Sequence, residues 1–169
     1  MNVVLIGMPA SGKSTVGVWL AKQLGFQFID TDLIIQQQSG KLPHELIAAH
    51  GMAEFVELEN RTCAALNADR AVIATGGSAV YGREAMAHLK QIGKVIYLKI
   101  SYETMTARLG DYVNRGVVLP AGYTLQDLYR ERAVLYERYA DFTVNEGSLD
   151  EGLGETLTKT LSICRTLLA

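Results

Sequence analysis

Residues 7–14 read G-M-P-A-S-G-K-S and directly follow the apolar run at residues 3–6. This G-x-x-x-x-G-K-S pattern is typical of a phosphate-binding loop, because its glycines allow a tight turn whose backbone NH groups point at phosphate oxygens. Lys13 adds a positive charge, and the hydroxyl of Ser14 can bind Mg2+. The sequence therefore predicts a strand followed by a phosphate-binding loop.

A helix is expected directly after this loop. Val16, Leu20 and Leu24 recur at helical spacing, and Gly25 stands where a helix-ending glycine is favoured. Such a helix points its first NH groups and the positive end of its dipole at a bound anion. The alternative is an ordinary glycine-rich turn between a strand and a helix.

Composition limits the class of protein. A chain of 169 residues is expected to form one domain, residues 1–169, that buries about two thirds of its unfolded surface. The net charge of -2 argues against a broad nucleic-acid interface. No apolar stretch approaches the roughly 18 residues of a membrane span, and the N-terminus does not resemble a secretion signal. We expect a cytoplasmic monomer with no nucleic-acid or membrane partner.

The order of apolar runs predicts the fold class. Strand-like runs at residues 2–6, 26–29, 71–74, 94–99 and 142–144 alternate with helical patterns, which is typical of an α/β fold with a mostly parallel sheet. Pro43 and Thr124 mark helix starts, and the last helix is expected at about residues 149–167. An irregular charged stretch at about residues 110–123 has the length of a functional loop.

Two carboxylates follow the second predicted strand. Asp30 and Asp32 are two positions apart, and alternate residues of a strand share a face, so both are expected on one side at the carboxyl end of the strand. In open α/β sheets ligands bind at that end. One carboxylate could hold Mg2+ through water, and the other could accept a proton from a substrate hydroxyl. The alternative is that an aspartate caps the next helix.

The third predicted strand ends in A-T-G-G-S at residues 74–78. Paired glycines, here Gly76 and Gly77, let a backbone approach a ligand closely and offer it NH groups. A plain turn would use the same residues.

Taken together, these motifs resemble the shikimate kinase family in order and spacing over nearly the whole chain. The resemblance rests on the phosphate-binding loop, F-x-D-x-D at residues 28–32, G-x-x-x-F-x-x-x-E at residues 51–59, A-T-G-G at residues 74–77, Arg115, and R-x-x-x-Y at residues 132–136. It implies a nucleoside-monophosphate-kinase-like P-loop fold with a five-stranded parallel sheet of order 2-3-1-4-5, helices on both faces, a lid at about 110–123 and a substrate-binding helical segment at about 31–62.

The resemblance also implies an activity, namely Mg2+-dependent transfer of phosphate from ATP to a ring hydroxyl of shikimate, a step of aromatic amino acid biosynthesis. The implied catalytic residues are Lys13, Asp32 and Arg115. The implied metal site is Ser14 and Asp30. The implied acceptor site is Asp32, Gly76, Gly77 and Arg132, with Arg132 on the carboxylate. The implied nucleotide site is Pro9, Ala10, Ser11, Gly12, Lys13, Ser14, Thr15 and Arg108, with Arg108 against adenine.

Three positions depart from the family pattern. Val56 stands where the family has an arginine that pairs with the substrate carboxylate, Ser78 replaces a third glycine, and Gly116 replaces a proline after the lid arginine. One lost charge-assisted hydrogen bond costs about 1.5 to 3 kcal/mol, or roughly 10- to 150-fold in affinity. Arg61 lies about 140° around the predicted helix from Val56 and is no simple substitute.

These departures leave two alternatives open beside shikimate phosphorylation. One is a related kinase that phosphorylates another hydroxylated metabolite. The other is a pseudokinase that binds nucleotide without transferring phosphate. A GTPase switch is disfavoured, because the sequence has neither a D-x-x-G nor an N-K-x-D motif.

Overall fold

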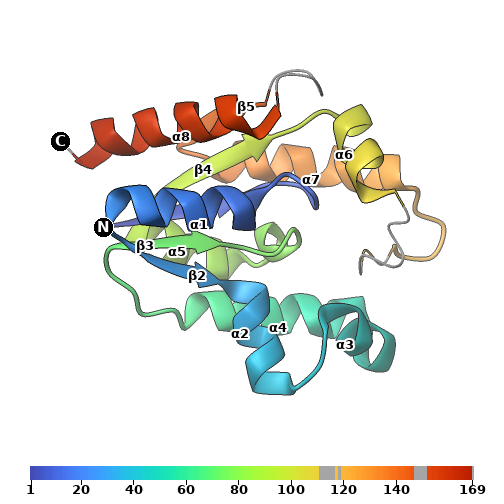
Figure 1. Cartoon of the computed structure of the whole chain (residues 1–169). Helices are drawn as coiled ribbons and strands as arrows, with labels where there is room; N and C mark the ends of the chain where they lie inside the picture. The colour runs from blue at the N-terminus through green and yellow to red at the C-terminus, as the bar shows by residue number, and fades with distance from the viewer. Residues whose placement is uncertain (111–116, 118, 147–151, 169) are drawn as a thin grey trace.

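The computed structural model of the chain describes residues 1–110, 117, 119–146 and 152–168. Five strands form one parallel sheet in the order β2-β3-β1-β4-β5 (Figure 1). The strands are β1 (Asn2–Ile6), β2 (Gln27–Asp30), β3 (Ala71–Ala74), β4 (Gly93–Lys99) and β5 (Phe142–Asn145). The predicted fold class, strand order and strand positions are therefore confirmed, with strand ends that differ by about one residue.

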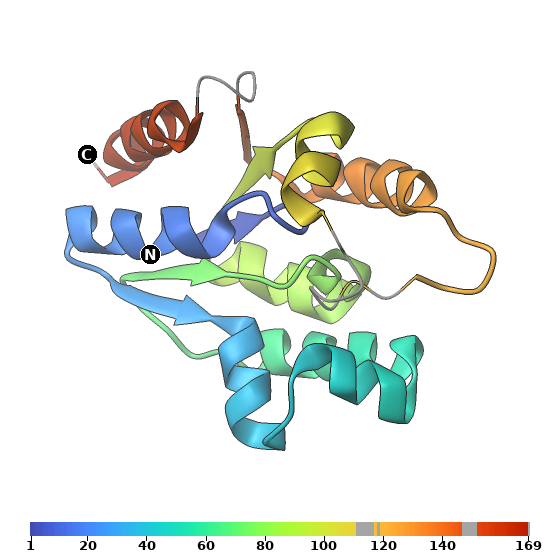
Figure 2. The same ribbon diagram turned by 45° about the vertical axis from the view of Figure 1, so that its right-hand side comes forward.

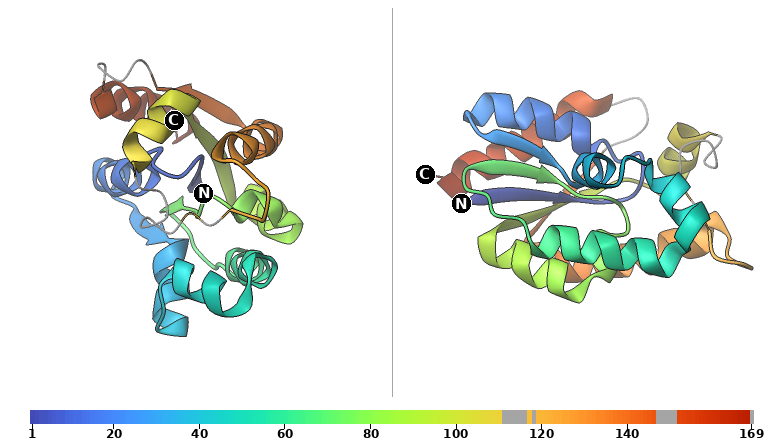
Figure 3. Two further views of the ribbon diagram at one scale, coloured as in Figure 1. Left: turned by 90° about the vertical axis from the view of Figure 1, so that its right-hand side faces the viewer. Right: turned by 90° about the horizontal axis from the view of Figure 1, so that it is seen from below.

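Helices cover both faces of this sheet. They are α1 (Lys13–Leu24), α2 (Thr31–Ser39), α3 (Pro43–His50), α4 (Met52–Ala64), the short 3-10 helix η1 (Ala79–Tyr81), α5 (Arg83–Ile92), α6 (Tyr102–Leu109), α7 (Leu125–Tyr139) and α8 (Gly152–Leu168). The end-on view in Figure 3 shows α1 and α8 on one side of the strands and α5 and α7 on the other. None of the described helices is long and apolar enough to span a membrane.

The central strand explains why two cores form. Every residue of β1 is buried, and successive side chains point to opposite faces. Val3 and Leu5 pack against α1 and α8, whereas Val4 and Ile6 pack in a second cluster with residues of α4, α5 and α7. A continuously apolar strand therefore holds two helical layers together, as a parallel sheet requires.

Local sequence sets the helix ends. Gly25 ends α1 in a left-handed conformation with φ of 65°, and Pro43 opens α3. Thr124 and Asp127 exchange the two hydrogen bonds of a capping box at the start of α7. These three predicted ends are confirmed. The last helix is described from Gly152, and residues 147–151 lie outside the described part of the chain.

A small third core stands at the end of β2. Ile35 of α2, Leu46 and Ile47 of α3 and Phe55 of α4 form it, and Figure 2 shows these helices beside the sheet edge rather than over its faces. The five parallel strands all end on the same side of the molecule as this group. A cavity lies between the loops after β1, β2 and β3 and the helices α3 and α4.

Candidate active site

A cavity of about 560 Å³ opens at the carboxyl ends of β1, β2 and β3. We call its two sides the phosphate end, lined by Pro9, Ala10, Gly12, Lys13, Ser14 and Thr15, and the acceptor end, lined by Asp32, Glu59, Gly76, Gly77, Ser78 and Arg132. Ser11 is buried next to this lining. The structure thus brings together most of the residues singled out from the sequence.

Lys13 is folded back onto its own loop at the phosphate end. Its Nζ donates to the carbonyl oxygens of Gly7 and Met8, both at 2.8 Å, and lies 3.4 Å from the Oγ of Ser11. Burial lowers the pKa of the Lys13 ammonium to about 8, partly offset by the charge of Asp32. The ammonium is therefore buried next to the space that a phosphate would fill, with hydrogen bonds that it can exchange for phosphate oxygens.

Asp30 connects the loop to the start of α2. Its Oδ2 accepts a hydrogen bond from Ser14 Oγ at 2.7 Å, and its Oδ1 accepts one from the backbone N of Asp32 at 3.0 Å. The expectation that both aspartates lie on one strand is wrong, since β2 ends at Asp30 and Asp32 lies in the first turn of α2. Capping decides this, because the Asp30 side chain satisfies an NH of the new helix.

Asp32 nevertheless reaches the cavity, from a helix instead of a strand. Burial raises the pKa of its carboxyl group, and the charge of nearby Asp30 adds to this, while Lys13 acts in the opposite direction. A carboxylate with a raised pKa holds a proton more readily than an ordinary aspartate. This is the property that a general base needs.

The Gly76–Gly77 turn was expected to offer its NH groups to a ligand, and for Gly76 the structure differs. The NH of Gly76 donates to Thr31 Oγ1 at 3.2 Å, so this group is occupied within the protein. A side chain at Gly76 would collide with Glu59 and would meet Oδ1 of Asp32 at 2.8 Å. Glycine is required here because two carboxyl groups approach the backbone, and not only because a ligand would do so.

Glu59 is the buried carboxyl group that the sequence motifs did not interpret. It is fully buried, and the hydroxyl of Ser78 donates to its Oε2, whereas its Oε1 has no hydrogen-bond partner among the described residues. Burial raises its pKa to about 7; Ser78 opposes the shift, and the charge of Asp32 adds to it. Its position, four residues from both Phe55 and Cys63 on the buried face of α4, is the sequence sign that could have revealed it.

Arg132 lines the acceptor end together with Glu59. It is only 6% exposed, its guanidinium lies 5.5 Å from the ring centre of Tyr81, and its Nε has no hydrogen-bond partner in the described part of the chain. A neighbour on α7, Tyr136, donates to the carbonyl oxygen of Gly77 at 2.6 Å and so attaches the helix to the glycine turn. The acceptor end thus contains a buried guanidinium whose Nε can still donate a hydrogen bond.

Val56 does not face this cavity. It lines a separate, mainly apolar pocket of about 380 Å³ whose wall also includes Tyr81, Leu128 and Arg132. Arg61 is exposed on α4 and lines neither space, which agrees with the prediction that it is no substitute. The departure at Val56 therefore changes the surroundings of Arg132 in a neighbouring pocket, which shares Met52 and Arg132 with the cavity.

Two predicted arginines have different outcomes. Arg108 lies next to the phosphate-binding loop but outside the cavity lining, and its Nη1 is 3.3 Å from the carbonyl oxygen of Ala10. Arg115 and Gly116 lie outside the described residues. Val117, which is described and belongs to the segment predicted as a lid, lines the cavity.

The oxygens of Ser14 and Asp30 have the chemistry of a magnesium site. A hydroxyl and a carboxylate oxygen lie 2.7 Å apart beside the loop, and Mg2+ prefers oxygen ligands, often keeps several waters and completes its shell with substrate phosphates. Among the described residues, no group of three or more His, Cys, Asp or Glu side chains forms a metal cage. The residues present fit an ion that binds mainly through nucleotide phosphates and water.

Comparison with known proteins agrees with this geometry. The family model described as shikimate kinase matches residues 9–162. A shikimate kinase of Gloeobacter violaceus is 37% identical over 166 residues, covering 96% of this chain and 93% of the relative. One of Thermodesulfovibrio yellowstonii is 34% identical over 162 residues, covering 94% of this chain and 93% of the relative.

Solved structures give the same result. The shikimate kinase from Acinetobacter baumannii in complex with shikimate superposes with a TM-score of 0.85 at 29% identity, covering 98% of this chain and 93% of that one. The enzyme from Aquifex aeolicus gives a TM-score of 0.78 at 30% identity, covering 97% of this chain and 98% of that one. The chain belongs to the shikimate kinase family and is a phosphotransferase that acts on a hydroxyl group.

Proposed function

We propose that this protein transfers the γ-phosphate of ATP to a ring hydroxyl of shikimate, giving shikimate 3-phosphate and ADP. The observation that carries the proposal is a single cavity that has a phosphate-binding loop at one end and Asp32 with Arg132 at the other. The match to a neighbour described as bound to shikimate supports the same acceptor.

Asp32 is the proposed general base. The substrate hydroxyl oxygen attacks the γ-phosphorus while the bond from that phosphorus to the ADP oxygen breaks, and the hydroxyl proton passes to the Asp32 carboxylate. Burial raises the pKa of Asp32 and so favours its protonated form after the transfer. Lys13 gives up its contacts with the carbonyl oxygens of Gly7 and Met8 and stabilises the charge on the phosphate oxygens.

The remaining predicted residues complete the proposal. Mg2+, held by Ser14 and by water on Asp30, supplies positive charge at the phosphates when bound. Arg108 contacts the nucleotide base, and Arg115 closes over the phosphates from the lid. Pro9, Ala10, Ser11, Gly12 and Thr15 complete the nucleotide site.

Arg132 is the proposed anchor of the substrate carboxylate, and Gly76 and Gly77 form the adjoining wall. Planar guanidinium groups bind carboxylates through two parallel hydrogen bonds, and the unpartnered Nε of Arg132 leaves capacity for such a bond. A monomeric state and a cytoplasmic location stay predictions.

The replacement at Val56 keeps a second function in view. Because the site has one arginine fewer for a substrate carboxylate, two other functions are compatible with the same residues. The protein would either phosphorylate another hydroxylated acid or bind nucleotide without transferring phosphate. The raised pKa of Asp32 favours a kinase over the pseudokinase, and a kinase for another hydroxylated acid would use the same general base.

A coupled assay of ADP production decides among these functions. We expect turnover with ATP, Mg2+ and shikimate, and a fall in kcat of about 10²- to 10⁴-fold in Asp32→Asn with ATP binding retained. Gluconate and nucleoside monophosphates serve as control acceptors. No shikimate turnover at millimolar substrate would exclude the first proposal, and ATP binding without transfer to any compound of a metabolite extract would favour the pseudokinase.

A further inference from the structure

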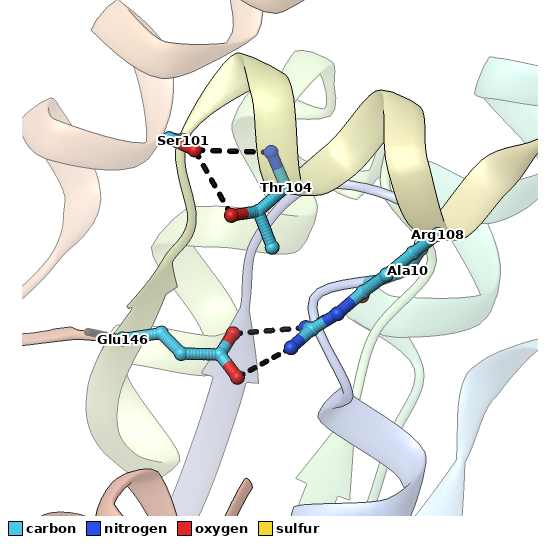
Figure 4. A network of polar contacts seen from close by, with 5 residues as sticks. All are labelled: Ala10, Ser101, Thr104, Arg108 and Glu146. Carbon is cyan, nitrogen blue, oxygen red and sulfur yellow. Dashed lines mark hydrogen bonds and ion pairs between the residues drawn. The ribbon is translucent and has the colours of Figure 1, made fainter. Parts of the chain in front are cut away.

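Arg108 is held in place by an acidic residue that the proposed reaction does not use. Its Nη1 and Nη2 donate to Oε2 and Oε1 of Glu146 at 2.9 and 2.6 Å, which makes the pair bidentate (Figure 4). The Glu146 side chain is 3% exposed, whereas 27% of the Arg108 side chain remains exposed. Such a pair fixes the plane of the guanidinium and not only its position.

Both partners are themselves anchored. The backbone N of Glu146 donates to the carbonyl oxygen of Lys99 at 2.9 Å, which fixes the residue directly after β5 to the end of β4. Arg108 lies in the last turn of α6, a helix capped at its start by Ser101 (Figure 4). Met105 and Leu109 pack this helix into the core. The pair therefore joins two parts of the fold that are 38 residues apart in sequence.

The same guanidinium also contacts the phosphate-binding loop. Ala10, whose carbonyl oxygen lies 3.3 Å from Nη1 of Arg108, has a φ of 63°, a left-handed conformation that a residue with a side chain rarely adopts. Because Glu146 neutralises Arg108, the guanidinium adds little to the field that attracts phosphates. The contacts to Glu146 and Ala10 use the edge of the guanidinium, and its flat face suits stacking on a nucleobase.

We propose that Glu146 is a positioning residue for the nucleotide, which holds the Arg108 guanidinium in the plane on which the base of ATP stacks and at a fixed distance from the phosphate-binding loop. This inference rests on the proposed function, because that function places the base against Arg108. It assigns Glu146 a role in binding the base and none in binding phosphate or the acceptor.

Calorimetric titration with ADP and with inorganic tripolyphosphate, without acceptor, separates the two parts of the nucleotide. In Glu146→Ala we expect the Kd for ADP to rise about tenfold, because the base loses an ordered plane on which to stack. The Kd for tripolyphosphate should stay the same or fall, because the charge of Arg108 is then no longer neutralised. Glu146→Gln keeps the shape and one hydrogen bond, so about threefold is expected for ADP. Arg108→Lys, which removes the planar group, should match Glu146→Ala.

Glu137→Gln is the matched control, because it removes an exposed ion pair with Lys99, at 2.8 Å, and should leave both Kd values unchanged. Unchanged ADP binding in Glu146→Ala would overturn the inference, and so would an equal loss of ADP and tripolyphosphate binding, which would indicate a structural effect on the loop. If Glu146→Ala does not fold, the Kd values of Glu146→Gln and Arg108→Lys for ADP and tripolyphosphate decide by the same criteria. Failure of the unmutated protein to bind ADP would instead contradict the proposed function.

Discussion

At the phosphate end of the cavity the buried ammonium of Lys13 has two carbonyl oxygens at 2.8 Å, whereas at the acceptor end two buried polar atoms, Glu59 Oε1 and Arg132 Nε, have no partner among the described residues. The phosphate end is largely self-satisfied before any ligand binds. The acceptor end carries a burial cost, because a buried polar atom without a hydrogen bond loses its hydration and regains nothing.

This difference follows from how each end is built. The phosphate end comes from consecutive residues of one loop, whose own backbone supplies the partners of Lys13. The acceptor end comes from side chains of α2, α4, α7 and the turn after β3, and two of the three departures from the family pattern, Val56 and Ser78, lie in or behind it. Stability and substrate affinity are therefore expected to respond more to changes at the acceptor end.

The largest expected effect is on the pH dependence of stability in Glu59→Gln. Burial raises the pKa of Glu59 to about 7 in the folded chain from an ordinary value of 4.5, so between these pH values the folded state binds more protons than the unfolded state. The folded state is stabilised by its stronger hold on the Glu59 proton. This stabilisation is fully present below pH 4.5 and is lost as pH rises through 7. Relative to the variant, the unmutated protein should lose about 3 kcal/mol of unfolding free energy from pH 4.5 to pH 8, measured by urea unfolding.

Glu57→Gln is the control for that measurement, because Glu57 is exposed on the same helix. It should leave the pH profile of the unmutated protein unchanged. Parallel profiles for Glu59→Gln and the unmutated protein would show that folding does not raise the pKa of Glu59. The contrast between the two ends of the cavity would then lose its main support.

Arg132→Lys is expected to raise the KM for the acceptor by about 10- to 150-fold and to leave the KM for ATP within about twofold. Lysine keeps the charge but loses the bidentate geometry. Initial rates at varied acceptor and fixed saturating ATP give the comparison, with exposed Arg130→Lys on the same helix as control. An equal rise in both KM values would mean that Arg132 supports the whole cavity and does not act on the acceptor alone.

The phosphate end has its own pH signature. Burial lowers the pKa of Lys13 to about 8, and only the charged ammonium attracts phosphate. Because kcat/KM reports the free enzyme, its value for ATP should fall about tenfold per pH unit above pH 8, whereas kcat at saturating ATP should fall less. A kcat/KM for ATP that stays flat to pH 9.5 would show that the ammonium is not desolvated in the free enzyme.

The sequence could predict the strands and the phosphate-binding loop because both depend on consecutive residues, the strands on short apolar runs and the loop on a fixed motif. It misplaced Asp32, because side-chain capping by Asp30 ends β2 and starts a helix where strand alternation was expected. It gave no role to Glu59 or Glu146. Their partners, Ser78 and Arg108, are 19 and 38 residues away, and only tertiary packing brings them together.

The smallest predicted effect tests the departure at Val56. Val56 shares its apolar pocket with Arg132, so an arginine introduced there can extend along the pocket wall toward the acceptor end, where the buried Glu59 would offset the repulsion between two guanidinium groups. We expect Val56→Arg to lower the KM for shikimate by about three- to tenfold, less than a full charge-assisted hydrogen bond because the pocket must adjust.

Val56→Met, which fills the same pocket without a charge, is the matched control and should leave the KM for shikimate unchanged. An unchanged or higher KM in Val56→Arg would show that a second cation cannot be used at this site. In that case Arg132 alone would hold the carboxylate of the acceptor. Hydroxylated acids that bind through a single arginine would then become candidate acceptors.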